Sequence, residues 1–498
     1  MIDLHNDALL ALPPAKLRTY LQQAKCDGVT EIWLSVWTTR LPDPITTIKA
    51  KKRLLDKLAG DPAYPVCRLH IEDAWFLTTE NLDDFIKLQP HSVGLTWNAA
   101  NALAGGAHSH RGITPWGRQV IAALESAGIQ IDTAHLNRRS FYQFARITTR
   151  PMVCTHTALN AIHRHPRNLT NRQIRTIVKS GGTVGLCLVP DFLTSNTTYC
   201  GFYDYLKHYL YFIKHFGREH LRIGTDFCGT DTLPDGLDNY RALQGLENAQ
   251  IIGSSVLRRP LIAYQFGNSS ACKRVLITGG MHAREWLTVD AVRGLIPLCS
   301  DLPRDVGVTL VPNCNPDGVL LATKGLTTVP RWRRHRLQRI NHCRDDFRLW
   351  KANARAVDLN VNFDAGWGQG HSNLTTPAPA NYIGRRPHSE PENKALLRLI
   401  KNFCPTVSLA LHSKGEVVYY SRVADRDTAH KIAELTQYRP IISADSYGGL
   451  TDYLALKCGV PSFTIEIGND CYPHPLGKEH LPDVMPRLQK VFYLLTGA

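Results

Sequence analysis

Histidine and acidic residues end several apolar runs in the first half of the chain. His5 and Asp7 are two residues apart, so they project to the same side of an extended strand, although such a pair alone more often has a structural role. Glu72 in HIED, His135 in IDTAH and His156 in VCTH each end another predicted strand. Together these residues offer five nitrogen or oxygen ligands of the kinds that suit zinc. With one carboxylate able to bridge, they predict a two-metal site at which an activated water attacks a carbonyl.

A second group of chemically capable residues lies in the last half of the chain. His282 and Glu285 in GGMHAREW are three residues apart, which places both on one face if the chain turns helically there. His412, at the end of the β-rich run in VSLALHSKG, is the expected third ligand of an open zinc site. Glu466 in PSFTIEIG ends a further apolar strand, and we expect it to act as the general base on water.

The elements that position the first group alternate short apolar runs with amphipathic stretches up to about residue 235. Strands are expected at residues 31–37, 91–97, 128–135, 151–156, 181–189 and 221–227, and helices at 115–127 and 171–179. Functional groups at the carboxyl ends of many strands are typical of a (β/α)8 barrel, whose site lies on that face. The predicted fold class is therefore α/β, with such a barrel at the N-terminus.

A domain boundary is expected between about residues 236 and 252, where turn-forming and acidic residues gather. After it, RPLIAYQF, KRVLITGG and VGVTLVPN predict new strands, so a second α/β unit begins. We place the two domains at residues 1–240 and 241–498. The basic run RWRRHRLQR at 331–339 is either a solvated loop or a basic rim that faces the substrate.

Composition narrows the classes of protein. The chain has 498 residues, 43% of them hydrophobic and 20% charged, which excludes a single small module and a largely disordered chain. Its net charge of +15 favours anionic partners, but no helix-turn-helix, zinc-finger or RNP-type motif supports a nucleic-acid-binding protein. Thirteen cysteines without a C-x-x-C pair, and no secretory signal or membrane span, predict a reduced, cytoplasmic protein with no membrane partner. Homo-oligomerisation is left open.

Seven segments of the first half resemble the membrane dipeptidase family, the renal dipeptidase-like group of the metal-dependent amidohydrolases. They are DLHNDAL, HIEDAWFL, GLTWNAAN, GITPWG, IDTAHLN, VCTHTALNAIHRHPRN and GTDFCG, in the family's order. The resemblance implies two zinc ions, with His5 and Asp7 on one, His135 and His156 on the other, and Glu72 bridging. It also implies that Arg167 holds the substrate carboxylate and that Asp226 handles the proton of attack and departure.

The first half departs from this family at two points. Where members commonly carry a substrate-contacting histidine, this chain has Trp97, whose indole N–H either donates one hydrogen bond to substrate or simply packs in the pocket wall. The segment after the last predicted strand is also much shorter than the family's C-terminal helical region. The closing helix is therefore expected to be missing or replaced.

Six segments of the second half resemble the zinc carboxypeptidase family, whose fold is a mixed eight-stranded sheet between helices. They are GGMHAREW, VPNCNPDGV, WKANARAVDLNVNF, SEPE, ALHS and SYGGLTDYLALKCGVPSFTIEIG. The resemblance implies one zinc on His282, Glu285 and His412, with Glu466 as general acid and base. It implies that Lys351, with Arg355 as its rival, polarises the scissile carbonyl and that Arg284 contacts substrate.

The motif DLNVNF shows how this half differs from a digestive carboxypeptidase. Asn360 is kept, but Val361 stands where the family has the arginine that grips a free C-terminal carboxylate. Thr451, at the specificity position before Asp452, predicts a small polar pocket, and Tyr447 is the candidate for the family's substrate-covering hydroxyl. The pattern most resembles the bacterial branch that cleaves γ-D-glutamyl-diaminopimelate bonds, whose acidic substrates suit a basic chain.

These resemblances together predict a bifunctional zinc peptidase that holds three zinc ions and acts on small, acidic, cell-wall-derived peptides. The C-terminal half would cut the γ-D-glutamyl-diaminopimelate bond, and the N-terminal half would split the resulting dipeptide of L-Ala-D-Glu type. The alternative is that only the C-terminal half is catalytic and the barrel is a structural or docking module.

Overall fold

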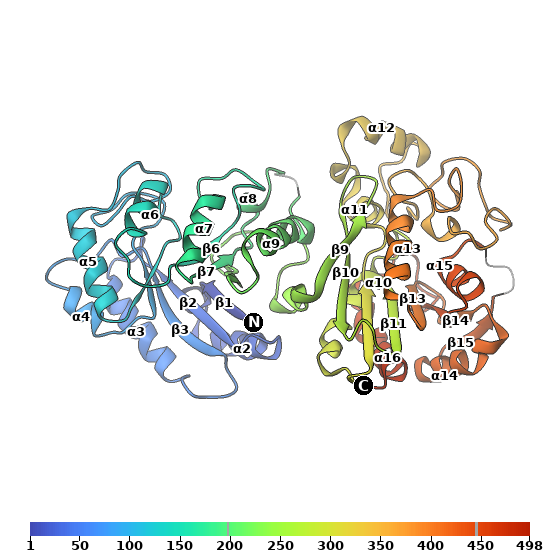
Figure 1. Cartoon of the computed structure of the whole chain (residues 1–498), viewed down its shortest axis with the longest axis horizontal. Helices are drawn as coiled ribbons and strands as arrows, with labels where there is room; N and C mark the ends of the chain where they lie inside the picture. Colours follow the sequence, from blue (N-terminus) through green and yellow to red (C-terminus); the bar gives the residue numbers. More distant parts are fainter. Residues whose placement is uncertain (197–198, 444–446) are drawn as a thin grey trace. The chain divides into compact units, whose positions relative to one another are not determined.

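The computed structural model describes residues 1–196, 199–443 and 447–498, which form two compact units, Met1–Leu243 and Gln244–Ala498 (Figure 1). The predicted boundary at 240/241 lies close to this division. Each unit has its own sheet and its own helices, so each is described separately.

The N-terminal unit is a closed barrel of eight parallel strands, which confirms the predicted fold. They are β1 (Ile2–Asn6), β2 (Glu31–Trp37), β3 (Val66–Glu72), β4 (Ser92–Gly94), β5 (Gln130–Asp132), β6 (Val153–Thr157), β7 (Thr183–Leu186) and β8 (Leu221–Ile223). The first and last strands pair at Asp3 and Ile223, which closes the barrel. Several strands are shorter than predicted, because the chain leaves the sheet early to form the loops of the carboxyl-terminal rim.

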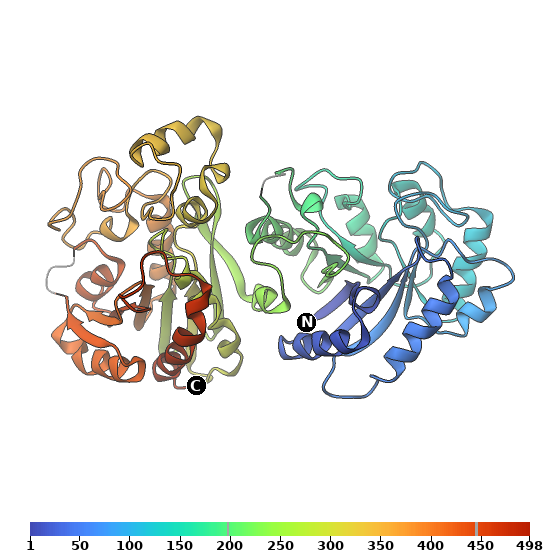
Figure 2. The ribbon, with the colours of Figure 1, turned by 180° about the vertical axis from the view of Figure 1, so that it is seen from behind.

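Helices surround this barrel, as the two opposite views in Figures 1 and 2 show. They are α1 (Ala8–Ala11), α2 (Pro14–Cys26), α3 (Pro44–Asp56), α4 (Leu82–Ile86), α5 (Pro115–Ser126), α6 (Arg138–Phe144), α7 (Asn171–Lys179), α8 (Pro190–Leu193) and α9 (Phe202–Phe216). Helix α7 begins with a capping box between Thr170 and Gln173 and buries Ile174 and Ile177. It spans the predicted residues.

The short segment after β8 is tied into the barrel by Tyr240 of the 3₁₀ helix η1 (Tyr240–Leu243). Its buried hydroxyl donates a hydrogen bond to the carboxylate of Asp3 and accepts one from Asn6 Nδ2 at 2.9 Å. Both partners lie on β1, so the segment secures the first strand although it is short. The barrel therefore closes without the long helical region of the family.

The C-terminal unit is built on a mixed eight-stranded sheet in the order β15-β14-β16-β13-β11-β12-β10-β9. The strands are β9 (Ala249–Ser254), β10 (Pro260–Gly267), β11 (Lys273–Thr278), β12 (Val306–Val311), β13 (Val407–His412), β14 (Val417–Tyr420), β15 (Arg439–Ile442) and β16 (Ser462–Glu466). The central strands β12, β11, β13 and β16 run parallel. Their carboxyl ends therefore share one edge.

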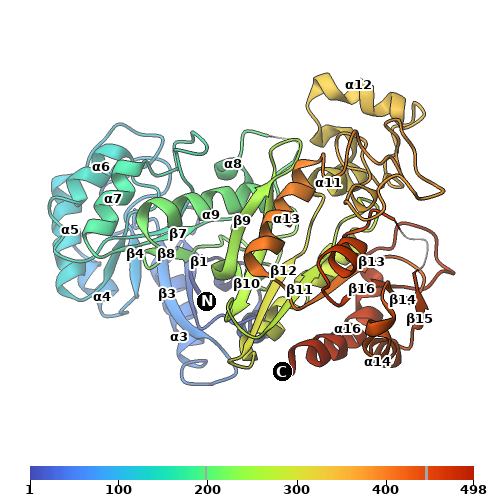
Figure 3. The same cartoon turned by 45° about the vertical axis from the view of Figure 1, so that its right-hand side comes forward.

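The helices of this unit are α10 (Leu287–Arg293), α11 (Pro316–Lys324), α12 (Arg331–Ile340), α13 (Pro391–Phe403), α14 (Arg426–Thr436), α15 (Leu450–Asp452) and α16 (Leu481–Thr496). Figure 3 shows α13 against the strands at the β9 end of the sheet. The prediction of a solvated loop at 331–339 is wrong, because this basic run forms α12. It buries only Leu337, so the run lacks the apolar stripe by which helices are recognised.

All thirteen cysteines are free. Among the residues that the structure describes, no helix combines the length and the apolar character needed to cross a bilayer.

Candidate metal centres

The carboxyl-terminal rim of the barrel brings six predicted site residues together. His5 lies on β1 and Asp7 just after it, Glu72 ends β3, and His156 lies on β6. His135 and Asp226 follow β5 and β8 by three residues each. Because all strands run parallel, their ends meet at one rim, which is why residues up to 221 positions apart share one site.

Glu72 lies between two groups of ligands. Its Oε2 is 3.9 Å from His5 Nε2, whereas its Oε1 is 2.7 Å from His135 Nε2 and 3.7 Å from His156 Nε2. On the first side, His5 Nε2 is 3.3 Å from Asp7 Oδ2 and 3.8 Å from Asp226 Oδ1. The two oxygens of Glu72 thus face different histidines, as a bridging ligand requires.

The buried carboxyl groups of this cluster would be stabilised in their ionised form by a bound cation. Burial raises the pKa of Glu72 to about 8 and that of Asp226 to about 7, and the neighbouring carboxylates add to both shifts. Burial alone would lower the pKa of His5, but Asp7, Glu72 and Asp226 together raise it to about 10. Burial also holds the pKa values of His135 and His156 well below the usual range, so both imidazoles are neutral. Neutral imidazoles are the form that binds metal.

Local backbone geometry supports the same site. His135 and Asp226 have φ angles of 66° and 61°, a left-handed conformation that costs energy for residues other than glycine and concentrates at functional sites. A side chain at Gly229 would collide with the carboxylate oxygens of Asp7 and Asp226, so the glycine leaves space beside them. The absence of a side chain at Gly229 therefore leaves free space next to the carboxylates of Asp7 and Asp226.

A layer of buried polar residues that sequence analysis did not identify supports the ligands. Asn98 Oδ1 accepts a hydrogen bond from His135 Nδ1 at 2.9 Å. His70 packs its ring 5.2 Å from that of His5, and its Nε2 lies 3.6 Å from Asp132. Asp132 in turn accepts a bond from Thr155 Oγ1 at 2.6 Å. Asp132 lies within the predicted strand at 128–135 and ends the observed β5, and an acid inside an apolar strand was the signal available in the sequence.

A cavity of about 370 Å³ opens onto this cluster, and Trp97 forms part of its wall. The Trp97 ring lies 6.0 Å from the ring of His135 and 5.3 Å from that of Trp37. Arg167 is buried and donates from Nη2 to His156 Nε2 at 2.8 Å. Both residues that were expected to touch substrate therefore lie beside the ligands.

The second centre forms at the carboxyl edge of the C-terminal sheet. His282 Nδ1 lies 2.8 Å from Glu285 Oε1, and His412 Nδ1 lies 3.0 Å from Glu285 Oε2 and 3.1 Å from His282 Nδ1. All three side chains are buried. His282 and Glu285 lie on a turn that precedes α10 rather than within a helix, because helical structure starts only at Leu287.

Glu466 is placed beside these ligands by strand register. It ends β16 and pairs with His412 on the neighbouring parallel strand. Burial and the nearby carboxylate of Glu285 raise its pKa to about 7, against the opposing charges of Lys351 and Arg284. A carboxyl group with a pKa near neutrality suits general acid–base chemistry.

Asp358 connects the ligand His282 to Lys351. Its Oδ1 lies 3.3 Å from His282 Nε2, and its Oδ2 lies 3.0 Å from Lys351 Nζ. Although its burial alone would raise the pKa, Lys351 and His282 hold the pKa of Asp358 well below its usual range. Sequence analysis did not identify this residue, although it opens the DLNVNF motif.

The structure separates the two candidate cations. Lys351 reaches the ligand cluster through Asp358, whereas Arg355 pairs with Glu390 at 3.6 Å and lines a different, basic pocket. The structure therefore favours Lys351 over Arg355 as the cation at this centre, because Arg355 pairs with Glu390 and not with Asp358.

The remaining predicted substrate residues of this unit have contacts of their own. Thr451 Oγ1 is 3.0 Å from Thr464 Oγ1, and Thr464 shares a strand face with Glu466. Asn360 Oδ1 accepts from the backbone N–H of Leu450 at 3.1 Å. Arg284, which was predicted to contact substrate, has a buried Nε without a hydrogen-bond partner in the described structure. The ring of Tyr447, which was predicted to supply a substrate-covering hydroxyl, packs against Gly366.

Both clusters fit divalent cations. Among the described residues, three groups bring ligand atoms within 4.8 Å of one another: His5, Glu72 and His156; His5, Asp7 and Asp226; and His282, Glu285 and His412. Mixed imidazole and carboxylate donors are typical of zinc. Burial of so many carboxylates without a compensating cation would be costly, and this supports metal at both places.

Each unit is similar to a known protein family. The family model of membrane dipeptidases (peptidase family M19) matches residues 67–251, and the model of zinc carboxypeptidases matches residues 245–475. The uncharacterized protein YqgT of Bacillus subtilis (strain 168) is 33% identical over 247 residues, which are 45% of this chain and 65% of that protein. Gamma-D-glutamyl-L-diamino acid endopeptidase 1 of Lysinibacillus sphaericus is 31% identical over 262 residues, 48% of this chain and 64% of that protein. The chain thus spans slightly less than two thirds of either relative.

Among solved structures, a metallo peptidase from Rhodobacter sphaeroides, liganded with a phosphinate mimic of the dipeptide L-Ala-D-Ala, is similar. Its sequence is 23% identical, the TM-score is 0.43, and the match covers 49% of this chain and 90% of that chain.

Proposed function

We propose that the chain is a zinc metallopeptidase in which both units are active, because the N-terminal unit matches the family model of membrane dipeptidases and the C-terminal unit matches that of zinc carboxypeptidases. The observation that carries this proposal is that each unit brings imidazole and carboxylate ligand atoms within 4.8 Å of one another. Neither set lacks a ligand that its family motif implies. The protein would then hold two zinc ions in the barrel and one in the C-terminal unit.

Zinc, when bound, supplies the positive charge that polarises the scissile carbonyl and lowers the pKa of water. In the barrel, Asp226 accepts the proton of the attacking water and returns it to the leaving amine, while Arg167 binds the substrate carboxylate. In the C-terminal unit, Glu466 performs the proton transfers and Lys351, held by Asp358, stabilises the developing negative charge. Arg284 binds substrate beside Glu466.

The substrates we propose are small acidic peptides derived from cell walls. For the C-terminal unit, the relative from Lysinibacillus sphaericus is named as an endopeptidase of γ-D-glutamyl-L-diamino acid bonds. Val361 in place of the carboxylate-gripping arginine argues against simple C-terminal trimming. The C-terminal unit would cut the γ-D-glutamyl-diaminopimelate bond, and the barrel would split the released dipeptide of L-Ala-D-Glu type.

Two matched variants test whether both centres work. The zinc-loaded protein is incubated with L-Ala-γ-D-Glu-diaminopimelate, and the products are identified by mass spectrometry. We expect Glu466→Gln to prevent release of diaminopimelate and Asp226→Asn to allow that release but to accumulate L-Ala-D-Glu.

The outcomes separate the alternatives. If Asp226→Asn changes nothing and the wild type never splits the dipeptide, only the C-terminal unit is catalytic and the barrel has another role. If the wild type releases neither product, the proposed substrate class is wrong. Elemental analysis accompanies the assay, because three zinc ions per chain are expected.

A further inference from the structure

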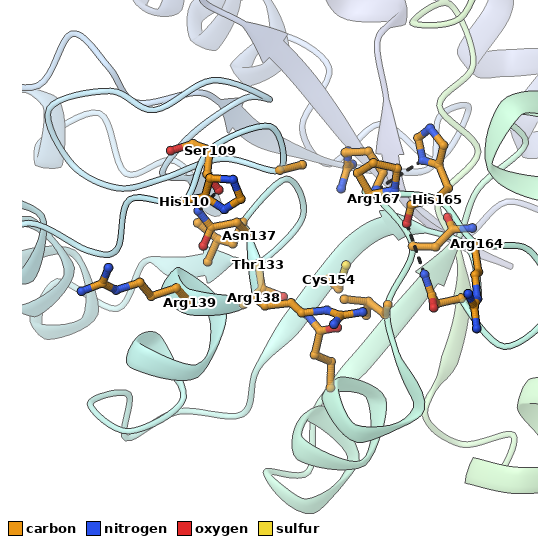
Figure 4. A pocket seen from close by; sticks show the side chains of 17 residues that line it. Ser109, His110, Thr133, Asn137, Arg138, Arg139, Cys154, Arg164, His165 and Arg167 are labelled. Carbon is orange, nitrogen blue, oxygen red and sulfur yellow. Dashed lines mark hydrogen bonds between the residues drawn. The ribbon is translucent and has the colours of Figure 1, made fainter.

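A second cavity, of about 900 Å³, lies beside the barrel's metal centre and is strongly basic (Figure 4). Its 17 lining residues come from the segments after β4 and β5 and from β6 to α7. They include four arginines, Arg138, Arg139, Arg164 and Arg167, and no aspartate or glutamate. We call this cavity the arginine pocket. Nothing in the catalytic chemistry described above uses three of its four arginines.

Arg167 joins the arginine pocket to the metal centre. Its Nη2 contacts His156 Nε2 at 2.8 Å, while its side chain also lines the pocket. The residue is 5% exposed, and its Nε is buried without a hydrogen-bond partner in the described structure. Its backbone is held by His165 Nδ1 at 3.2 Å and by Thr157 Oγ1 at 3.0 Å. Arg167 is thus a fixed cation at the boundary, with donor capacity left for a ligand.

Arg138 and Arg164 supply the charge farther from the metal centre. Figure 4 shows them on different sides of the hollow, Arg138 from the start of α6 and Arg164 from the loop before Arg167, whereas Arg139 points away from them. Neither Arg138 nor Arg164 forms an ion pair with any described residue, and both are exposed. Guanidinium groups that share a cavity without acids repel one another, so an anion that enters gains from all of them.

We propose that the arginine pocket is a specificity site for a second carboxylate in the substrate, on the side chain of the residue after the scissile bond. Arg167 binds the main-chain carboxylate of that residue, and Arg138 and Arg164 bind its side-chain carboxylate. The barrel therefore selects dipeptides with an acidic C-terminal residue. This inference rests on the proposed dipeptidase function and assigns its selectivity to named residues. The cavity volume lies in the upper part of the usual range for ligand sites, so it accommodates a glutamate side chain.

A pair of nearly isosteric peptides tests the proposal, because L-Ala-D-Glu and L-Ala-D-Gln differ in one charge. Their dissociation constants are measured by calorimetry on the zinc-loaded, full-length Asp226→Asn protein, in which the bound peptide stays intact. We expect L-Ala-D-Glu to bind about 10- to 100-fold more tightly, as charge-assisted hydrogen bonds would give. When Arg138→Gln and Arg164→Gln are both added to the Asp226→Asn protein, its affinity for L-Ala-D-Glu should fall nearly to its affinity for L-Ala-D-Gln. Its affinity for L-Ala-D-Gln should stay unchanged. Arg118→Gln, at an exposed arginine of α5 outside the pocket, should retain the preference.

The proposal would be overturned if the Asp226→Asn protein, with Arg138 and Arg164 intact, bound the two peptides with equal affinity. A double variant that weakens both peptides equally would also overturn it, since that result indicates a structural effect. Hydrolysis by the protein with Asp226 intact separates this question from the proposed function. Cleavage of both peptides without a preference in binding refutes only the specificity site, whereas a clear binding preference without cleavage refutes only the dipeptidase activity.

Discussion

Replacement of Asp358 by asparagine is the most direct test of how the second centre is held together. The Asp358 side chain is fully buried and has no spare acceptor: Oδ1 faces His282 Nε2 and the N–H of Asn360, and Oδ2 faces Lys351 Nζ and the N–H of Asn381. An amide has one NH₂ group, which in either orientation would point at donors. Asp358→Asn therefore leaves the ligand His282 without its orienting acceptor or leaves the Lys351 charge uncompensated.

The expected cost follows from these contacts. Loss of a charged hydrogen-bond partner behind a metal-binding histidine typically weakens metal binding about 10- to 100-fold, or about 1.4–2.8 kcal/mol. We expect Asp358→Asn to lower zinc affinity at the C-terminal centre by this amount, measured by competition with a chromophoric chelator. Zinc held by the barrel is the internal reference, and Asp346→Asn, at an exposed acid paired with Arg348, is the matched control. An Asp358→Asn protein whose C-terminal zinc affinity stays within about twofold of wild type would refute this account.

Three further predictions concern stability. Burial raises the pKa of Glu392 from its ordinary value of 4.5 to about 8. Between these two pH values the folded protein keeps a proton that the unfolded chain loses. The free energy of unfolding therefore falls as the pH rises through this window. Because Gln cannot ionise, the stability of Glu392→Gln relative to wild type should rise by about 2–4 kcal/mol between pH 4.5 and pH 8.5 in urea denaturation. A difference in stability that does not change with pH would contradict this. Tyr240→Phe should destabilise the barrel by about 1–3 kcal/mol, because the lost hydroxyl donates a hydrogen bond to Asp3 and accepts one from Asn6. An unchanged melting temperature would show that these two hydrogen bonds contribute nothing to stability. Chelation of zinc should lower the melting temperature, with zinc in large excess over its Kd contributing about 4 kcal/mol, and re-addition of zinc but not magnesium should restore it.

The strand ends of the barrel could be predicted from the sequence because the hydrophobic pattern that identifies each strand lies within one short segment. Apolar runs such as that before His135 identify buried parallel strands, and parallel strands in a barrel deliver their carboxyl ends to one rim. The chemistry of the ligands was also readable, since imidazoles and carboxylates at such ends have few structural uses. Strand lengths were less predictable: Gln130–Asp132 is much shorter than the apolar segment around it, because loop residues near the rim are buried too.

Other features depended on contacts between distant segments. The sequence favours Lys351 as the cation but leaves Arg355 as a rival, and only the placement of Asp358 and Glu390 separates them. The basic run Arg331–Ile340 has no apolar stripe, so its helical state could not be read from hydrophobic periodicity.

The sequence by itself determined which residue types could bind metal and which strands would carry them, because side-chain chemistry and hydrophobic patterning belong to each segment alone. Only the tertiary structure decided which charges meet. It placed Glu72 between His5 and two further histidines, Asp358 between a ligand and a lysine, and three arginines from two segments of the chain around one cavity. The physical reason is that electrostatic and hydrogen-bond energies depend on distances of a few ångströms, which are set by the packing of segments far apart in the chain.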